Sequence, residues 1–367
     1  MELYVFDRNL NRIGIVDDYV SLKVERNYRK QSTLELTVGA DEELVRLLRK
    51  ENILVKSNEM NLGYIIETFE YTDVDGSEIY VQANSLSSIL NRRIILGQKE
   101  IYGTADFVMK EFVRDNAVEP RNANRKIPSL GISGTLGMGS ETTIGAANEN
   151  LSELLFDVGN SYDLTHDIKL DLRAKTMTFD VWQGVDRTTE QNQRPYVIFS
   201  REFENVLSQS YVDSNSNYRS TAITSGEDAI NRASITIHNE IEGLDRFEVF
   251  IDANNIKKTY TNEDGEEVTL NTIQYLELLA SYGSGKLSSM KSIQTLESSV
   301  DPNSQFVYGI DYFLGDKVSV RNAELNVVLH TRIVSVVEQY DSAGFNLAID
   351  FGENVPSIIE KIKRSGF

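Results

Sequence analysis

The chain has 367 residues, no cysteine, three histidines and a formal net charge of −19 at pH 7. The lack of cysteine excludes disulfides, thiolate metal sites and cysteine nucleophiles, and the acidic balance opposes stable binding to nucleic acid. No apolar run approaches the ~20 residues that a membrane-spanning helix needs, so we expect a chain made in the cytosol without membrane insertion.

Residues 1–90 show the period-two alternation of half-buried strands, as in Leu34, Leu36 and Val38. The segment 41–50 interrupts this pattern and places its leucines on one face of a short helix. Asp75-Gly76 separates two β-rich runs and predicts a hairpin. These features predict a small antiparallel barrel or sandwich.

Residues 91–195 change to a mixed pattern. A helical stripe covers 104–116 with Thr104 as N-cap, and a glycine-rich loop follows at 129–145. A second helix begins at Asn150 and is expected to end at Gly159. Alternation at 168–172 and 177–181 then predicts a hairpin, which gives an α+β domain.

After the polar boundary at 183–195, strand patterns return over 196–251 and 301–351. The intervening residues 252–300 read as an insertion that contains a helix near 272–283. The last segment, 352–367, has an apolar stripe after Pro356 and predicts a C-terminal helix.

The stretch 65–81 can be laid without gaps over 333–349, with Asp73 on Asp341 and Gly76 on Gly344. Any two amphipathic hairpins share part of this pattern, so chance similarity and duplication both remain open. Each hairpin also follows a strand. The simplest reading is a mainly β protein of α+β type, in which two similar small antiparallel β-barrels are separated by the α+β domain and the second carries a helical insertion.

Several motifs suggest chemistry but lack essential parts. The string SYGSGKLS at 281–288 has Ala280 where a phosphate loop needs its first glycine and Leu287 where it needs Ser or Thr. The loop at 129–145 lacks the buried parallel strand of a dinucleotide site, so we expect a mobile or partner-contacting loop. The two Asp-Gly turns are too short for calcium loops.

The three histidines, His166, His238 and His330, are far apart in sequence, and the last two read as strand residues. The chain contains no zinc-protease pattern and no nucleophile elbow. We therefore predict no catalytic, cofactor-binding or metal-binding residues and no cofactor. Carboxylate pairs for glycoside hydrolysis stay open, because the abundance of acidic residues makes such pairs uninformative.

The stretch YGIDYFLGDKVSV at 308–320 contains two aspartates ahead of an alternating strand. Asp311 can accept backbone hydrogen bonds in the turn, and Gly315 can supply a positive φ. We therefore expect Asp311 and Asp316 to build the turn and to take no part in metal binding or catalysis.

Four strings taken together resemble one family: LSELLFDVGNSYDL with the hairpin that follows it, FENVLSQSYVDSNSNYRSTAITSGE, YGIDYFLGDKVSV, and TRIVSVVEQYDSAGFNLAIDFG. They are similar to the tail hub, or tail-associated, proteins of long-tailed bacteriophages of Gram-positive hosts and their prophages, the Gp37-like family. The resemblance covers much of 150–355. Residues 1–95 agree with the family more in their hydrophobic pattern than in residue identity.

The resemblance implies a non-enzymatic virion protein assembled in the host cytoplasm. It implies a homotrimeric tail-tip or baseplate hub around the DNA exit channel, like the hubs of contractile tails and type VI secretion spikes. The implied partners are the distal tail protein, the tail tube or tape measure protein, and a receptor-binding or fibre protein. Larger relatives carry hydrolase modules, and we expect none in this chain. The alternatives are a cell-wall hydrolase, either peptidase or glycosidase, and a carbohydrate-binding β module.

Overall fold

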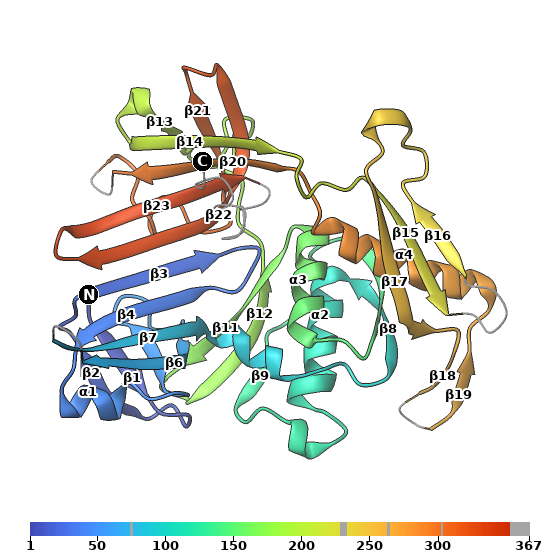
Figure 1. Cartoon of the computed structure of the whole chain (residues 1–367), viewed down its shortest axis with the longest axis horizontal. Coiled ribbons are helices and arrows are strands. Elements are labelled where there is room, and N and C mark those ends of the chain that lie inside the picture. Colours follow the sequence, from blue (N-terminus) through green and yellow to red (C-terminus); the bar gives the residue numbers. More distant parts are fainter. Residues whose placement is uncertain (74–75, 228–232, 263–264, 302–303, 353–367) are drawn as a thin grey trace.

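The computed structural model describes residues 1–73, 76–227, 233–262, 265–301 and 304–352. The fold is mainly β, with α2 (Ala105–Val113), α3 (Leu151–Tyr162) and α4 (Thr272–Ser288) in the middle of the molecule and the short α1 (Glu42–Leu47) beside the N-terminal strands (Figure 1). The predicted C-terminal helix at 352–367 lies outside the described residues, apart from Gly352, which ends a strand.

The N-terminal part is antiparallel, as expected from its alternation. Its elements are β1 (Leu3–Phe6), β2 (Arg12–Val16), β3 (Ser21–Asn27), β4 (Thr33–Gly39), α1 (Glu42–Leu47), β5 (Ile53–Lys56), β6 (Tyr64–Asp73) and β7 (Ser77–Ser85). The alternating side chains of β4 point Leu34, Leu36 and Val38 into a core where each is fully buried. Asp41 caps α1 by accepting a hydrogen bond from the Leu44 amide.

The C-terminal strands form a second group. It contains β13 (Ile198–Ser200), the 3-10 turn η4 (Arg201–Phe203), β14 (Val206–Ser214), β20 (Ile293–Val300), β21 (Lys317–Asn322), β22 (Val327–Asp341) and β23 (Gly344–Gly352). The group is antiparallel except for the parallel pair β13–β21. Its core is separate from that of the N-terminal group and centres on aromatic residues such as Phe199, Tyr312 and Phe351.

One 13-stranded sheet runs through both groups in the order β14-β20-β23-β22-β3-β4-β7-β6-β5-β1-β2, with β21 beside β22 and β13 beside β21. The join is the antiparallel pair β3–β22, which extends from Ser335 opposite Asn27 to Asp341 opposite Ser21. The two groups therefore share backbone hydrogen bonds as well as side-chain contacts (Figure 1).

The two strand groups have the same internal order. The N-terminal group follows β3-β4-β7-β6-β5 and the C-terminal group follows β14-β20-β23-β22-β21, each with its strands in the same chain sequence. The hairpins differ in turn length, since Asp73 pairs with Ser77 but Asp341 pairs with Gly344. The pairing in the two hairpins therefore differs by one residue from the gapless overlay of 65–81 on 333–349, although Ile79 and Val81 are buried as their counterparts Leu347 and Ile349 are.

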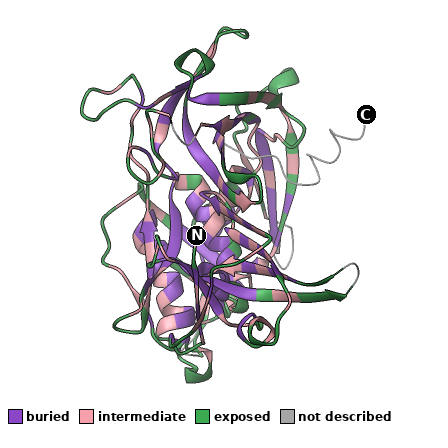
Figure 2. Cartoon of the chain, turned by 90° about the vertical axis from the view of Figure 1, so that its left-hand side faces the viewer, coloured by how far each residue is buried: buried purple, intermediate pink, exposed green. Residues whose placement is uncertain are grey.

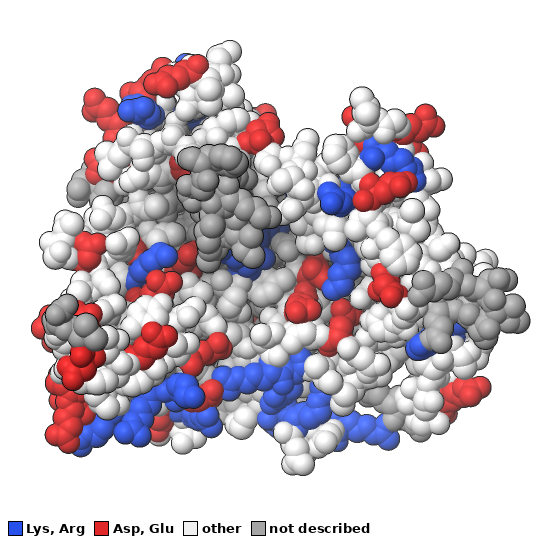
Figure 3. All heavy atoms as spheres, viewed as in Figure 1, with Lys and Arg blue, Asp and Glu red and all other residues white. Residues whose placement is uncertain are grey.

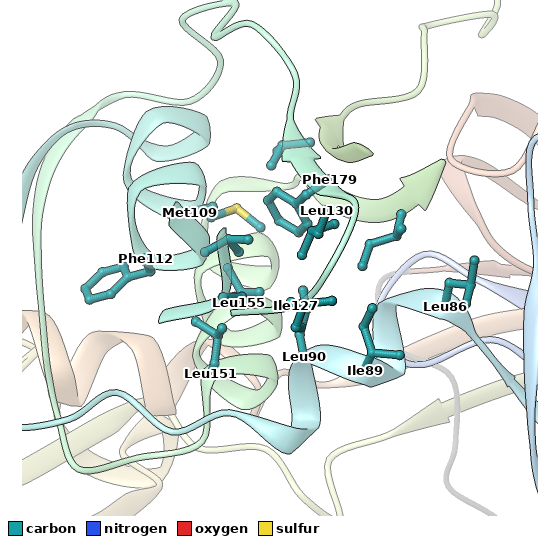
Figure 4. Close-up of a cluster of buried hydrophobic side chains, with 14 of the residues drawn as sticks. Leu86, Ile89, Leu90, Met109, Phe112, Ile127, Leu130, Leu151, Leu155 and Phe179 are labelled. Atoms are coloured by element: carbon teal, nitrogen blue, oxygen red, sulfur yellow. The ribbon is translucent and has the colours of Figure 1, made fainter. Parts of the chain in front are cut away.

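The middle of the chain forms a third core around two helices. Its elements are η1 (Leu86–Arg92), β8 (Gln98–Thr104), α2 (Ala105–Val113), η2 (Arg114–Val118), η3 (Ala123–Arg125), β9 (Leu130–Ile132), β10 (Glu141–Ala147), α3 (Leu151–Tyr162), β11 (Thr165–Asp171) and β12 (Thr176–Trp182). Figure 4 shows side chains from η1, α2, α3 and the β9–β12 sheet meeting in this core. Buried residues concentrate between these layers and exposed residues on loop tips (Figure 2).

The inserted residues form a lobe at the far side of the helices from the large sheet (Figure 1). It contains β15 (Thr221–Glu227), β16 (Ser234–Ile237), η5 (Gly243–Asp245), β17 (Glu248–Lys257), β18 (Thr259–Thr261), β19 (Glu267–Thr269) and α4 (Thr272–Ser288). The strands β15 and β16 and the first part of β17, expected in the second barrel at 196–251, instead form a separate three-stranded sheet that α4 covers. The strand β20, expected in the insertion, joins the large sheet. Strand patterns cannot distinguish these partners, because pairing depends on distant residues.

Two helix ends differ from expectation. The helix α3 continues past Gly159 to Tyr162 and ends on Asp163, whose φ of 57° is left-handed. Gly159 serves a different purpose, since a Cβ there would lie 2.8 Å from the Leu164 carbonyl oxygen. The helix expected near 272–283 extends to Ser288, so the segment 281–288 forms the last turns of α4.

Candidate functional site

The turn at 308–320 is built by its aspartates, as predicted. The buried carboxylate of Asp316 accepts hydrogen bonds from the Val185 amide at 2.9 Å, the Arg187 Nε at 2.8 Å and the Phe313 amide at 3.1 Å. It therefore ties the segment after β12 to the start of β21. Three of the acceptor positions of this carboxylate are thus used to hold the turn.

The other parts of the turn behave as expected. Asp311 accepts a hydrogen bond from the Val307 amide at 2.8 Å. Gly315 adopts a φ of +85°, and a Cβ there would lie 2.6 Å from the ring of Tyr28. Tyr312 is fully buried against Phe199, whereas Phe313 remains 44% exposed. The turn therefore packs against its own strand group and leaves one aromatic side chain at the surface.

A second carboxylate, Asp163 at the end of α3, joins three parts of the chain. It accepts hydrogen bonds from Arg332 of β22, through Nε at 3.0 Å and through Nη2, and from Arg29 Nη2 after β3 at 2.6 Å. Burial alone would raise the pKa of Asp163, but the two guanidinium groups hold it below its ordinary value. The ion cluster fixes the helical core against both strand groups.

A third set of buried charges lies at the same junction. Lys56 of β5 donates to Glu338 of β22 at 2.7 Å, with side chains 3% and 7% exposed. Arg26 of β3 pairs with Asp167 of β11 at 3.3 Å and with Glu59 at 2.8 Å. Buried charges of this kind destabilise a fold when one partner is lost, so they favour one relative placement of the three parts.

These contacts make the junction the best-defined polar site in the described part of the chain. Sequence reasoning missed Asp163, Arg26 and Lys56, because each looks like an ordinary surface residue in its local pattern. The only local signal was Asp163 after a helix, where a left-handed residue is common. A shallow hollow of about 430 Å³ opens at this junction beside Arg26, Asp167 and Trp182.

The glycine-rich loop is pinned at its centre. Asp106, buried at the start of α2, accepts hydrogen bonds from the backbone amides of Leu136, Gly137 and Met138 at 2.8 to 3.1 Å. The loop predicted at 129–145 is shorter than expected, because β9 and β10 occupy its two ends, and residues 136–138 between them are held against α2. Thr104, the predicted N-cap, donates to Asp106 and makes no cap bond of its own.

The histidines are dispersed. His166 is buried in β11 with both ring nitrogens unpartnered among the described residues, between Phe156 and Phe179. His330 lies in β22 as expected, whereas His238 follows β16 with a φ of 55° and is a turn residue. Within the described ranges, no group of side chains could hold a metal ion and no helix has the length and apolarity to span a membrane. The absence of catalytic and cofactor residues stays a prediction.

A cavity of about 600 Å³ lies between α3, α4 and the lobe sheet. Lys286 of α4 reaches Asp157 of α3 at 2.7 Å and Glu149 at 3.5 Å there. Burial raises the pKa of both carboxyls above their ordinary values. Acidic and basic side chains lie close together on this face in Figure 3, over α3 and α4. This cavity is the one place where the enzymatic alternative can be tested directly.

Comparison with protein families gives one match over nearly the whole chain. The family model described as Siphovirus ReqiPepy6 Gp37-like protein matches residues 2–353. No curated protein sequence matches the chain.

Three solved structures share the fold over almost the entire length. The tail protein from Neisseria meningitidis MC58 matches with a TM-score of 0.56 and 11% identity, covering 96% of each chain. Prophage tail protein gp18 from Listeria monocytogenes EGD-e matches with a TM-score of 0.54 and 11% identity, covering 100% of this chain and 98% of that one. The 43 kDa tail protein of prophage MuSo2 from Shewanella oneidensis matches with a TM-score of 0.54 and 14% identity, covering 96% of this chain and 98% of that one. At these identities the likeness shows a common fold.

Proposed function

The chain belongs to the Siphovirus ReqiPepy6 Gp37-like family, and from this premise we propose that it is a non-enzymatic structural protein of a phage tail. The three solved structures that share its fold are tail proteins, which supports the same location in the virion. In this proposal the chain is made in the host cytoplasm and assembles into the tail tip or baseplate.

The finer proposal is a homotrimeric hub around the DNA exit channel. The observation that carries it is the repeated strand order, β3-β4-β7-β6-β5 and β14-β20-β23-β22-β21, joined through β3–β22. A chain with two similar units gives six similar units in a trimer, and so can match a sixfold tail tube with threefold symmetry. We propose that these units are the two barrels of the hub.

The proposed domain division follows from the sequence boundaries. By these boundaries, residues 1–90 supply the first barrel, 91–195 lie between the two barrels in the chain, and 196–251 with 301–351 supply the second barrel around an insertion at 252–300. Because β15, β16 and β17 form the lobe sheet and β20 joins the large sheet, the proposed second barrel contains β13, β14 and β20 to β23, and the insertion comprises β15 to α4. The buried ion cluster at Asp163 supports a rigid placement of the units, which a ring subunit requires.

The proposed partners are a second and third copy, the distal tail protein, the tail tube or tape measure protein, and a receptor-binding or fibre protein. Solution mass combined with negative-stain imaging tests the central claim. We expect three copies in a ring with an open or plugged centre, for the chain alone or together with its distal tail protein. A solid monomer under both conditions would contradict the hub.

The net charge of −19 adds a proposal about DNA passage. Acidic side chains on the channel wall would repel phosphates and remove the counterion release that favours binding, so DNA would pass without adhering. A trimer structure with a neutral or basic channel would exclude this idea while leaving the hub intact.

The enzymatic alternative rests on one observation, the pair Glu149 and Asp157 around Lys286 in the cavity between α3 and α4. We expect the purified chain to release no soluble fragments from peptidoglycan. Turnover that is lost in Glu149→Gln and kept in the exposed control Glu153→Gln would establish a hydrolase instead.

A further inference from the structure

A basic band crosses the lower edge of this acidic molecule (Figure 3). The contacts place Arg8, Arg92, Arg93 and Arg125 in this band, with Lys126 next to Arg125 in the sequence; they come from the β1–β2 turn, η1 and η3. Its members are connected: Arg8 and Arg92 share Glu51 at 2.9 and 2.8 Å, and Arg93 donates to the Arg125 carbonyl at 2.7 Å. The patch is therefore continuous.

The band has an excess of positive charge that its internal contacts do not neutralise. Arg8 and Arg92 have side chains 69% and 41% exposed and one carboxylate between them. Burial and the neighbouring charges of Arg125 and Arg92 lower the pKa of Arg93, as expected for crowded cations. Like charges held together repel each other, and an acidic partner relieves this repulsion.

Two exposed apolar side chains lie within the band. Ile94 and Leu96 follow Arg92 and Arg93 directly and are 49% and 46% exposed. A nucleic-acid surface pairs cations with phosphates and needs no aliphatic contact, whereas protein interfaces combine apolar contacts with a charged rim. The composition of the band thus favours a protein partner.

A surface with the opposite charge lies elsewhere on the same chain. A groove of about 510 Å³ between the β2–β3 connection and α1 is lined by Asp17, Asp18, Asp41 and Glu43, with no basic residue in its lining. It also contains exposed apolar surface at Val20, which is 52% exposed. The acidic groove therefore complements the basic band in charge and in apolar content.

From this complementarity we propose that the basic band of one copy docks on the acidic groove of a second copy of the chain. The two surfaces differ, so the contact is heterologous and can close into a ring when repeated. The inference rests on the proposed hub, for which it names the surfaces that bring copies together. Each exposed ion pair contributes little, so many pairs act together and the contact is sensitive to salt.

Charge reversal tests the contact in the full chain. Arg92→Glu with Lys126→Glu should weaken self-association at least tenfold in sedimentation velocity, and so should Asp17→Lys with Asp18→Lys. The chain that combines all four changes should regain association, because the reversed surfaces again attract each other. Arg201→Glu with Arg321→Glu is the matched control, since both arginines are exposed and paired with single glutamates on another part of the molecule.

The outcomes separate this inference from the hub. A wild-type trimer that tolerates both reversals, or a quadruple variant that stays dissociated, overturns the docking proposal and leaves the hub standing. A wild-type chain that stays monomeric together with its distal tail protein overturns both. Binding of a 30-base-pair DNA duplex that the Arg92→Glu, Lys126→Glu variant loses would assign the band to nucleic acid and overturn the docking proposal.

Discussion

At the scale of single residues, His166 is the clearest test of the helical core. Its imidazole is buried without a hydrogen bond in the described structure, and burial lowers its pKa from 6.5 to about 4. The folded protein therefore excludes a proton that the unfolded chain accepts. The folded state suffers no penalty from this residue above pH 6.5, and the free energy of unfolding decreases as the pH falls from 6.5 towards 4.

We expect the free energy of unfolding to fall by about 2 kcal/mol between pH 7 and pH 5 through this residue. His166→Phe, which keeps an aromatic ring beside Phe156 and Phe179, should remove that part of the pH dependence. Urea titrations of both proteins at the two pH values measure the difference. Equal acid sensitivity in the variant would show that His166 is not the titrating group.

Asp316 gives a second residue-scale prediction. Asp316→Asn removes the negative charge that faces Arg187. It also replaces one acceptor oxygen by an NH2 group, which cannot accept from the three surrounding N–H donors. We expect the free energy of unfolding to fall by about 3 kcal/mol, as for a broken buried ion pair. Asp311→Asn is the matched control, because the amide oxygen can still accept from Val307, and it should cost under ~1 kcal/mol. Thermal unfolding compares the two, and equal losses would contradict the assigned role of Asp316.

At the scale of elements, glycines set how closely α4 packs on the lobe sheet. A Cβ at Gly283 would lie 1.9 Å from Thr224 Oγ1 of β15, whereas a Cβ at Gly285 on the same helix would meet nothing within 4 Å. We expect Gly283→Ala to destabilise the lobe by about 1 to 3 kcal/mol through overpacking. Gly285→Ala should be neutral or stabilise by up to ~1 kcal/mol, because alanine favours the helix.

Hydrogen exchange of the β15 and β17 amides would report this difference locally. Faster exchange in Gly283→Ala with unchanged β6 and β7 amides is the expected result. The prediction fails if both alanine variants behave alike, since the close approach of α4 would then not depend on Gly283.

The sequence predicted elements better than their partners. Period-two alternation located β4, β11, β12 and the β22–β23 hairpin, because side-chain burial on one face is a local property. It could not assign β15 to the lobe sheet or extend α3 past Gly159, since pairing and close approach depend on distant residues. Asp316 was identified from its turn, whereas Asp163 gathers partners from Arg29 to Arg332 that no local pattern connects.

At the scale of the whole molecule, the β3–β22 pairing predicts that the two strand groups unfold together. They share a continuous sheet and the buried pair Lys56–Glu338. Neither group can therefore unfold without breaking the β3–β22 hydrogen bonds and this ion pair. We expect one cooperative transition in urea, with the amides of β7 and β23 losing protection at the same free energy. Earlier exchange of β23 alone would show that the groups are independent.

The same pair allows the coupling to be measured. Glu338→Ala leaves the Lys56 ammonium buried with only Glu59, 3.2 Å away, and should cost about 3 kcal/mol. Replacing both partners, as Lys56→Met with Glu338→Leu, should recover most of that loss, because no uncompensated charge remains. Fluorescence of Trp182, the only tryptophan, reports this junction directly through its 3.2 Å hydrogen bond to Asp167. A ring subunit needs its two strand groups held in one orientation. A double variant that is stable yet fails to form trimers would therefore show that the buried charges specify this orientation more than they stabilise the fold.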